Sequence, residues 1–136
     1  MNRAGRVGLA AAVLVVLAGC SNRNAPQAGS PHSGNVQVTA GADGVQAITI
    51  TGTDKLRFDP STFHVHPGKV EIILADTGTT PHDLTFTGKL GQSIPMTMHG
   101  QQHSIVLTVT KPGTYPFECS LHVRENMTGT MIVDPR

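Results

Sequence analysis

The sequence predicts an all-β fold, a Greek-key β-sandwich of about seven to eight strands. Between residues 36 and 136 no stretch has the apolar period of an amphipathic helix, whereas short strand-like runs recur between turn signals. The chain contains 15 Gly and 9 Pro, which favour turns. A domain of roughly 100 residues can bury a sandwich core without disulfides.

Seven segments carry the strand pattern. Polar and apolar residues alternate in 46–51 and 83–87, while 70–75 and 104–109 are rich in β-branched and aliphatic side chains. The predicted strands are residues 46–51, 62–65, 70–75, 83–87, 104–109, 114–118 and 128–133. Residues 91–100 show neither period, so we expect a loop there.

The N-terminal residues have the features of an export signal. Arg3 and Arg6 precede an apolar run, 7–17, that is too short to span a bilayer comfortably. The run ends in Leu-Ala-Gly-Cys20, which resembles the lipobox of bacterial lipoproteins and implies cleavage before a lipid-bearing Cys20. A plain secretory signal with a chance cysteine is the alternative. The expected division is a signal peptide (1–19), a lipidated Cys20 with a flexible tether (20–35) and one domain (36–136).

This division predicts an exported protein, anchored to a bacterial membrane and facing outside the cytoplasm. The chain has ten Lys and Arg and nine Asp and Glu, so loss of Arg3 and Arg6 leaves eight against nine, a formal charge of −1. No run of basic residues is present. Nucleic-acid affinity depends on clustered Lys and Arg, so no nucleic-acid partner is expected. We expect a monomer.

Cys119 is the only thiol left if Cys20 carries lipid. An unpaired thiol is a liability in an oxidising compartment, and a bound metal would explain its persistence. A buried structural cysteine is the alternative. Strand alternation puts Tyr115, Phe117 and Cys119 on one face, which the aromatic residues mark as the core. The sulfur therefore points inward at one end of the sandwich.

Potential metal ligands surround this cysteine in the sequence. Cys119, His122 and Met127 have the spacing Cys-x2-His-x4-Met, and His82 supplies a second imidazole upstream. Two imidazoles, a thiolate and a weak axial thioether are the ligands of a blue-copper site. Zinc bound by Cys and two His is the rival metal, but zinc rarely uses a thioether. A Cys–His nucleophile is the enzymatic alternative, although no oxyanion motif is visible.

The domain resembles the cupredoxin family, the plastocyanin-like small blue copper proteins, over nearly all of residues 36–133. The resemblance is carried by Pro67-Gly68-Lys-Val-Glu-Ile, Asp76-x-Gly78-x3-His82, Pro112-Gly113-Thr-Tyr-Pro-Phe-x-Cys119, the Cys-x2-His-x4-Met spacing and Gly129-Thr-Met-Ile-Val. It implies one copper ion per chain, cycling between Cu(I) and Cu(II). The strong ligands would be His82, Cys119 and His122, and Met127 would be the long axial ligand.

Two positions depart from the family pattern. Asp83 and Asp76 stand where the family usually has Asn. The family residue after the first histidine helps to tie the two ligand loops together. A carboxylate at Asp83 could still accept hydrogen bonds, but it would add negative charge near copper and lower its potential. The resemblance also implies that His122 reaches solvent within an apolar patch, for which Pro81, Leu121 and Val123 are candidates.

The expected function is electron transfer. Four protein ligands leave no open coordination position for a substrate, so we expect a carrier of single electrons between redox proteins at the cell envelope and not an enzyme.

The alternative is a lipoprotein that buffers copper, carries it or hands it to copper-handling proteins. Met96, Met98, His99 and His103 cluster in the sequence and would form a second, weaker metal site. The simpler interpretation is that the methionines cover the end of the sandwich and the histidines face solvent. One tightly bound copper ion per chain would favour electron transfer, and two or more would favour copper handling.

Overall fold

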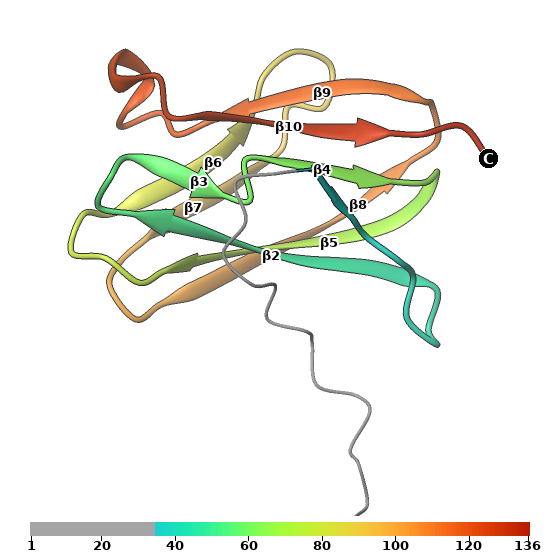
Figure 1. Ribbon diagram of the computed structural model, residues 1–136, viewed down its shortest axis with the longest axis horizontal. Coiled ribbons are helices and arrows are strands. Elements are labelled where there is room, and N and C mark those ends of the chain that lie inside the picture. Colours follow the sequence, from blue (N-terminus) through green and yellow to red (C-terminus); the bar gives the residue numbers. More distant parts are fainter. Residues whose placement is uncertain (1–34) are drawn as a thin grey trace, which may run out of the picture.

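The structure, a computed structural model, describes residues 35–136 as two packed β-sheets (Figure 1). The predicted signal peptide, Cys20 and all of the tether except residue 35 lie outside the described residues. Within residues 35–136 there is no α-helix, and so none that is long and apolar enough to cross a membrane.

The described part of the chain forms ten strands and one 3₁₀ helix. They are β1 (Asn35–Gln37), β2 (Val45–Thr53), β3 (Arg57–Asp59), β4 (Thr62–Val65), β5 (Gly68–Asp76), β6 (His82–Phe86), β7 (Ser93–Thr97), β8 (Gln102–Val109), β9 (Gly113–Glu118), η1 (Val123–Glu125) and β10 (Thr128–Val133).

The strands form a six-stranded sheet, β1-β4-β10-β9-β6-β7, and a four-stranded sheet, β3-β2-β5-β8. Several neighbours in a sheet are distant in sequence: β10 pairs in parallel with β4, and β2 pairs in parallel with β5. The predicted all-β sandwich is confirmed, and each of the seven predicted strands is present. The count of ten exceeds seven to eight because β7 was not predicted and because β1 and β3, with three residues each, are too short to show a period.

The predicted loop at 91–100 is wrong, because Ser93–Thr97 forms β7 and pairs with β6. The register between these strands shifts between His82 and Leu84. Ile94 and Thr97 are consequently both buried although they are three positions apart. A β-bulge breaks the period of two by which a strand is recognised in sequence.

Aromatic rings fill the centre of the sandwich. The ring of Phe117 packs edge-on against Phe58 and Phe86, with centroids 5.2 and 5.5 Å apart. Gly129 lies opposite Phe117 on β10, where a side chain would collide with the ring. Phe117 and Cys119 are buried as predicted, whereas Tyr115 is only partly buried. The core face of β9 therefore leads directly to Cys119.

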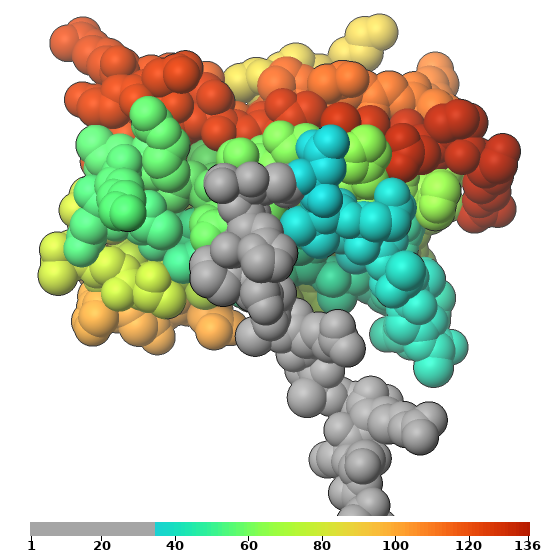
Figure 2. Space-filling model, in the orientation of Figure 1, coloured from blue at the N-terminus to red at the C-terminus, as the bar shows by residue number. Residues whose placement is uncertain are grey.

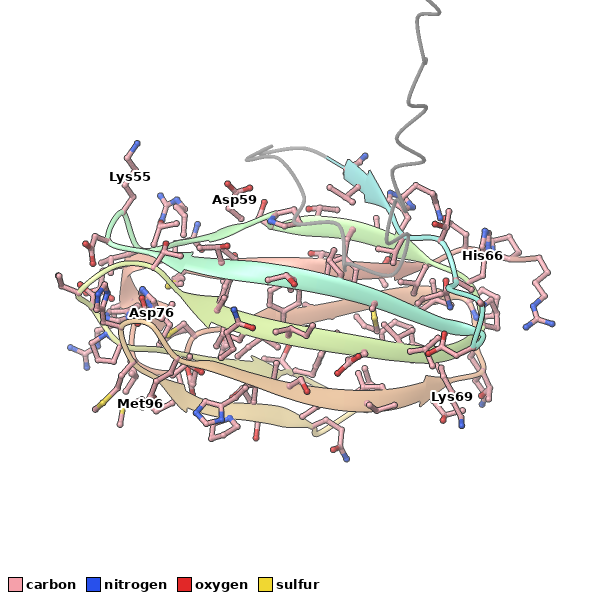
Figure 3. The ribbon with its side chains drawn as sticks, turned by 90° about the horizontal axis from the view of Figure 1, so that it is seen from below. Lys55, Asp59, His66, Lys69, Asp76 and Met96 are labelled. Atoms are coloured by element: carbon pink, nitrogen blue, oxygen red, sulfur yellow. The ribbon has the colours of Figure 1, made fainter. Side chains whose placement is uncertain are left out.

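Four loops gather at one end of the sandwich, at the left of Figure 1. We call it the ligand end; it is formed by residues 54–56, 77–81, 98–101 and 119–127. Figure 3 places Lys55, Asp76 and Met96 at this end and His66 and Lys69 at the other.

Candidate metal centre

Three of the four predicted ligands meet at the ligand end. His82 begins β6, Cys119 directly follows β9 and His122 lies in the next loop. Their candidate ligand atoms all lie within 4.8 Å of one another. The Sγ atom of Cys119 is 3.4 Å from Nδ1 of His122 and 4.0 Å from Nδ1 of His82.

These separations fit a single metal ion. Metal–nitrogen bonds of about 2.0 Å and a metal–sulfur bond of about 2.3 Å put nitrogen and sulfur ligands roughly 3.5–3.7 Å apart at tetrahedral to trigonal angles. The two observed sulfur–nitrogen distances bracket that range. The His82 and His122 rings are inclined at 62° with centroids 5.2 Å apart, so both can direct Nδ1 towards the sulfur without stacking.

The protonation of the site also suits a metal. Burial lowers the pKa of His82, Asp76 opposes this shift, and His122 reinforces it. Burial likewise raises the pKa of the Cys119 thiol; the Asp83 backbone opposes the shift and the Asp83 side chain reinforces it. A neutral imidazole is ready to coordinate, whereas the thiol needs a cation to stabilise its thiolate.

One atom of His82 has no hydrogen bond. Its Nε2 atom is buried and forms no hydrogen bond with any of the residues that the structure describes. The Thr53 backbone is close enough to raise the pKa of His82, but it does not complete a hydrogen bond to this atom. The ring is held by packing, because a Cβ on Gly52 would come within 2.5 Å of the His82 Cδ2 atom.

The loop from Cys119 to Met127 is closed by its own backbone. The amide of Cys119 donates to the Met127 carbonyl at 3.0 Å, and the amide of Met127 donates to the His122 carbonyl at 3.2 Å. Asn126 adopts the left-handed conformation, with φ 58°, where the chain turns back. Met127 is fully buried directly before β10. Its axial role stays a prediction.

The loop that leads to His82 is held in place by a side chain from another loop. Asp54, between β2 and β3, accepts hydrogen bonds from the backbone amides of Thr79 at 2.8 Å and Thr80 at 2.9 Å. These bonds lower the pKa of Asp54, with the Thr80 amide as the largest cause. Sequence reasoning missed both Asp54 and Gly52. Gly52 did carry a signal, because glycine inside a strand often marks a close approach.

Asp83 joins the two ligand loops. Its carboxylate accepts hydrogen bonds from the Ser120 amide at 2.6 Å and from the Ser120 hydroxyl at 2.5 Å. Asp83 follows His82, and Ser120 follows Cys119, so the link fixes two ligands relative to each other. The expectation that a carboxylate here could still accept hydrogen bonds is confirmed.

The surface beside the cluster is apolar. Leu121 and Val123 are 50% and 46% exposed, while Pro81 and His122 are half-buried. The ligand loop also contacts the β2–β3 segment, where the Arg57 guanidinium donates to the Glu125 carbonyl at 3.1 Å. Figure 2 shows these segments, orange-red and green, side by side at the left end.

The second predicted cluster also reaches the ligand end. Met96 and Met98 are 48% and 49% exposed, and Nδ1 of His99 hydrogen-bonds the Gly78 carbonyl at 2.6 Å. His103 is exposed on β8, opposite Leu74 of β5. Within residues 35–136, His82, Cys119 and His122 are the one group of three or more His, Cys, Asp or Glu residues with metal-binding separations. A second site that uses the methionines stays a prediction.

Known proteins resemble this chain in sequence. The cupredoxin-like domain family matches residues 9–133. Chloroplastic plastocyanin of Hordeum vulgare is 32% identical over 89 residues, which cover 58% of this chain and 56% of that protein. The match therefore spans little more than half of the length of that relative. Plastocyanin of Lactuca sativa is 28% identical over 89 residues, which cover 58% of this chain and 89% of that protein.

Solved structures share the fold. Reduced auracyanin from Roseiflexus castenholzii matches with a TM-score of 0.59 at 19% identity, over 71% of this chain and 100% of that one. An oxidised proline-to-alanine mutant of amicyanin matches with a TM-score of 0.53 at 30% identity, over 68% of this chain and 85% of that one.

Cupredoxin homologues bind one copper ion, and His82, Cys119 and His122 form the candidate site for it here. Because the family match extends over well more than half of the sequence, this chain belongs to the cupredoxin-like domain family.

Proposed function

We propose that this protein is a type 1 (blue) copper protein that carries single electrons between redox partners at the cell envelope. The observation that carries the proposal is the buried cluster of His82, Cys119 and His122 at the end of a cupredoxin sandwich. Auracyanin A of Chloroflexus aurantiacus, which shares the fold, is a "blue" copper protein. Export and a lipid anchor at Cys20 rest on the lipobox pattern and would keep the domain near membrane-bound partners.

The protein's role would be to hold its ligands still. Bound copper supplies a one-electron couple, Cu(I)/Cu(II). His82, Cys119 and His122 would hold it, with Met127 as the weak fourth ligand. Packing against Gly52, the bonds to Asp54 and the Asp83–Ser120 link restrain these side chains. Little movement of the ligands on a change of charge means a small reorganisation energy and fast electron transfer.

His122 is the proposed route for the electron. Its ring is half-buried, while His82 and Cys119 are fully buried. The exposed side chains of Leu121 and Val123 flank it in sequence. A redox protein that docks on this apolar surface would come closest to the centre through the His122 ring.

The same site is poorly suited to nucleophilic catalysis. A reactive cysteine needs a lowered pKa, because the thiolate is the nucleophile. Burial raises the pKa of Cys119 instead. The site therefore supports a role for Cys119 as a metal ligand and not as a nucleophile.

The test is to add Cu(II) to the purified protein and record its visible spectrum. An intense blue band that is absent from Cys119→Ser is expected, because the band requires the copper–thiolate bond. A weakly absorbing or colourless wild-type complex would contradict the proposal.

Copper handling is the second candidate function, and the exposed thioethers of Met96 and Met98 favour it. Thioethers prefer Cu(I). Equilibrium dialysis against Cu(I) gives the stoichiometry. We expect one tightly bound ion per chain; two or more, falling to one in the double variant Met96→Leu/Met98→Leu, would support copper handling.

A further inference from the structure

Asp76 is a buried carboxylate with only one of its oxygens paired. It ends β5 and is 2% exposed. Its Oδ1 accepts a hydrogen bond from the Gly78 amide at 2.9 Å, and its Oδ2 is buried without a partner in the described part of the chain. Burying a carboxylate whose oxygens are not all hydrogen-bonded costs folding free energy, so the presence of Asp76 at this position needs an explanation.

Asp76 lies beside the copper ligand His82. Asp76 pairs with Gly52 across the β2–β5 ladder, and the His82 ring packs on Gly52. Both residues are therefore grouped around the same glycine at the ligand end, where Figure 3 also shows Asp76.

We propose that the charge of Asp76 lowers the reduction potential of the copper centre. The inference rests on the proposed function. The Cu(II) state of a site carries one more positive charge than the Cu(I) state, so a fixed negative charge nearby stabilises Cu(II) preferentially. Burial strengthens this effect, since a charge away from water is poorly screened by solvent and salt.

Asp83 is the contrasting carboxylate. It is half-buried, and its two oxygens accept hydrogen bonds from Ser120. Partial exposure lets solvent screen its charge, and its structural link to Ser120 would change on substitution. Asp76 lacks such a link to the cysteine loop, so its electrostatic contribution can be measured with less disturbance of the ligands.

The experiment compares the copper-loaded full chain with Asp76→Asn, which has nearly the same shape and keeps an oxygen that can accept from Gly78. The expected result is a shift of about tenfold in the Cu(II)/Cu(I) equilibrium towards Cu(I), equivalent to a potential about 59 mV higher. The wavelength of the blue band should not change. The shift should persist between about 0.05 and 0.5 M salt, because a buried charge is weakly screened.

Glu71→Gln is the matched control. It removes the same charge from the same strand, but Glu71 lies five residues towards the other end, where it accepts a hydrogen bond from Ser104. Its effect on the potential should be small and should vanish in high salt. Asp76→Ser removes the charge in a smaller side chain and provides a second test if Asp76→Asn folds poorly.

Each outcome separates the inference from the proposed function. A blue wild-type protein whose potential is unchanged in both Asp76 variants would overturn the inference alone. A higher potential accompanied by a shifted blue band would also overturn it, because Asp76 would then act through ligand geometry. A wild-type protein without a blue band would overturn the proposed function and, with it, this inference.

Discussion

The two ligand loops of this protein are held in place in opposite ways. The loop from Cys119 to Met127 is closed by hydrogen bonds between its own backbone groups. The loop that leads to His82 depends on other elements: Asp54 binds its amides, and Gly52 leaves space for the ring. The loop from Cys119 to Met127 is therefore closed mainly by local bonds, with added contacts from Asp83 and Arg57, whereas the loop that leads to His82 is positioned by tertiary structure.

This difference predicts different responses to mutation. Changes to the distant supports should move His82 while the cysteine loop keeps its conformation. Changes within the loop from Cys119 to Met127 (the cysteine loop) should lower the free energy of unfolding only by the cost of the altered backbone conformation at the substituted residue.

Gly52→Ala should have the largest effect on copper binding. The added Cβ would come within 2.5 Å of Cδ2 and 2.9 Å of Cγ of His82, so the ring must move. We expect a loss of more than about tenfold in Cu(II) affinity and a destabilisation of about 1–3 kcal/mol from overpacking. Competition with a chelator and thermal unfolding measure the two effects.

Gly41→Ala, in the turn before β2, is the control and should leave copper affinity unchanged. Wild-type affinity and an unchanged blue band in Gly52→Ala would show that the His82 ring does not depend on this glycine.

Asp83→Ala should have the next largest effect, because it breaks the link between the two loops. The amide and hydroxyl of Ser120 both lose their charged acceptor. Hydrogen bonds to charged groups are worth about 1.5–3 kcal/mol, and we expect a loss of this size in denaturant unfolding of the metal-free protein.

Asp83→Asn retains an oxygen that can accept from the Ser120 amide, so it should lose less than half as much stability. Equal losses in the two variants would indicate that the charge of Asp83, and not the geometry of its link, is what stabilises the loops.

Asn126→Ala should produce a smaller, local effect. Asn126 has φ 58° and ψ 40°, a left-handed conformation that asparagine tolerates better than alanine. The expected cost is about 1 kcal/mol in unfolding free energy. Asn126→Gly should be nearly neutral, since glycine adopts this conformation freely. A large loss of copper affinity in Asn126→Gly would contradict the view that backbone conformation is the main contribution of this residue.

Asp54→Asn should have the smallest effect, and that effect should depend on pH. Hydrogen bonds from the amides of Thr80 and Thr79 lower the folded-state pKa of Asp54 below its ordinary value of 3.8. The carboxylate therefore adds stability above pH 3.8, and this contribution disappears as pH falls through the lower folded-state pKa. Thermal unfolding of metal-free wild type and variant should differ at about pH 6 and converge in acid, by about pH 2. A difference that does not change with pH would argue against an ionised Asp54 as the acceptor.

Much of the cysteine loop could be predicted from the sequence because its determinants are close together. The alternation of Phe117 and Cys119 indicated the buried face, and the spacing to His122 placed a second ligand within reach. In contrast, β7 was missed because a β-bulge obscures its period, and Asp54 was missed because no local pattern relates it to residues 25 and 26 positions further on.

The sandwich, the strand that leads to Cys119 and the candidate ligands near it could be predicted from the sequence, because alternation and spacing are local properties of the chain. The close packing of His82 on Gly52, the hydrogen bonds to Asp54 and the incompletely hydrogen-bonded carboxylate of Asp76 could be found in the folded structure alone. These features depend on which strands become neighbours. That choice is made when the two sheets pack, and it joins residues that no short segment of sequence contains.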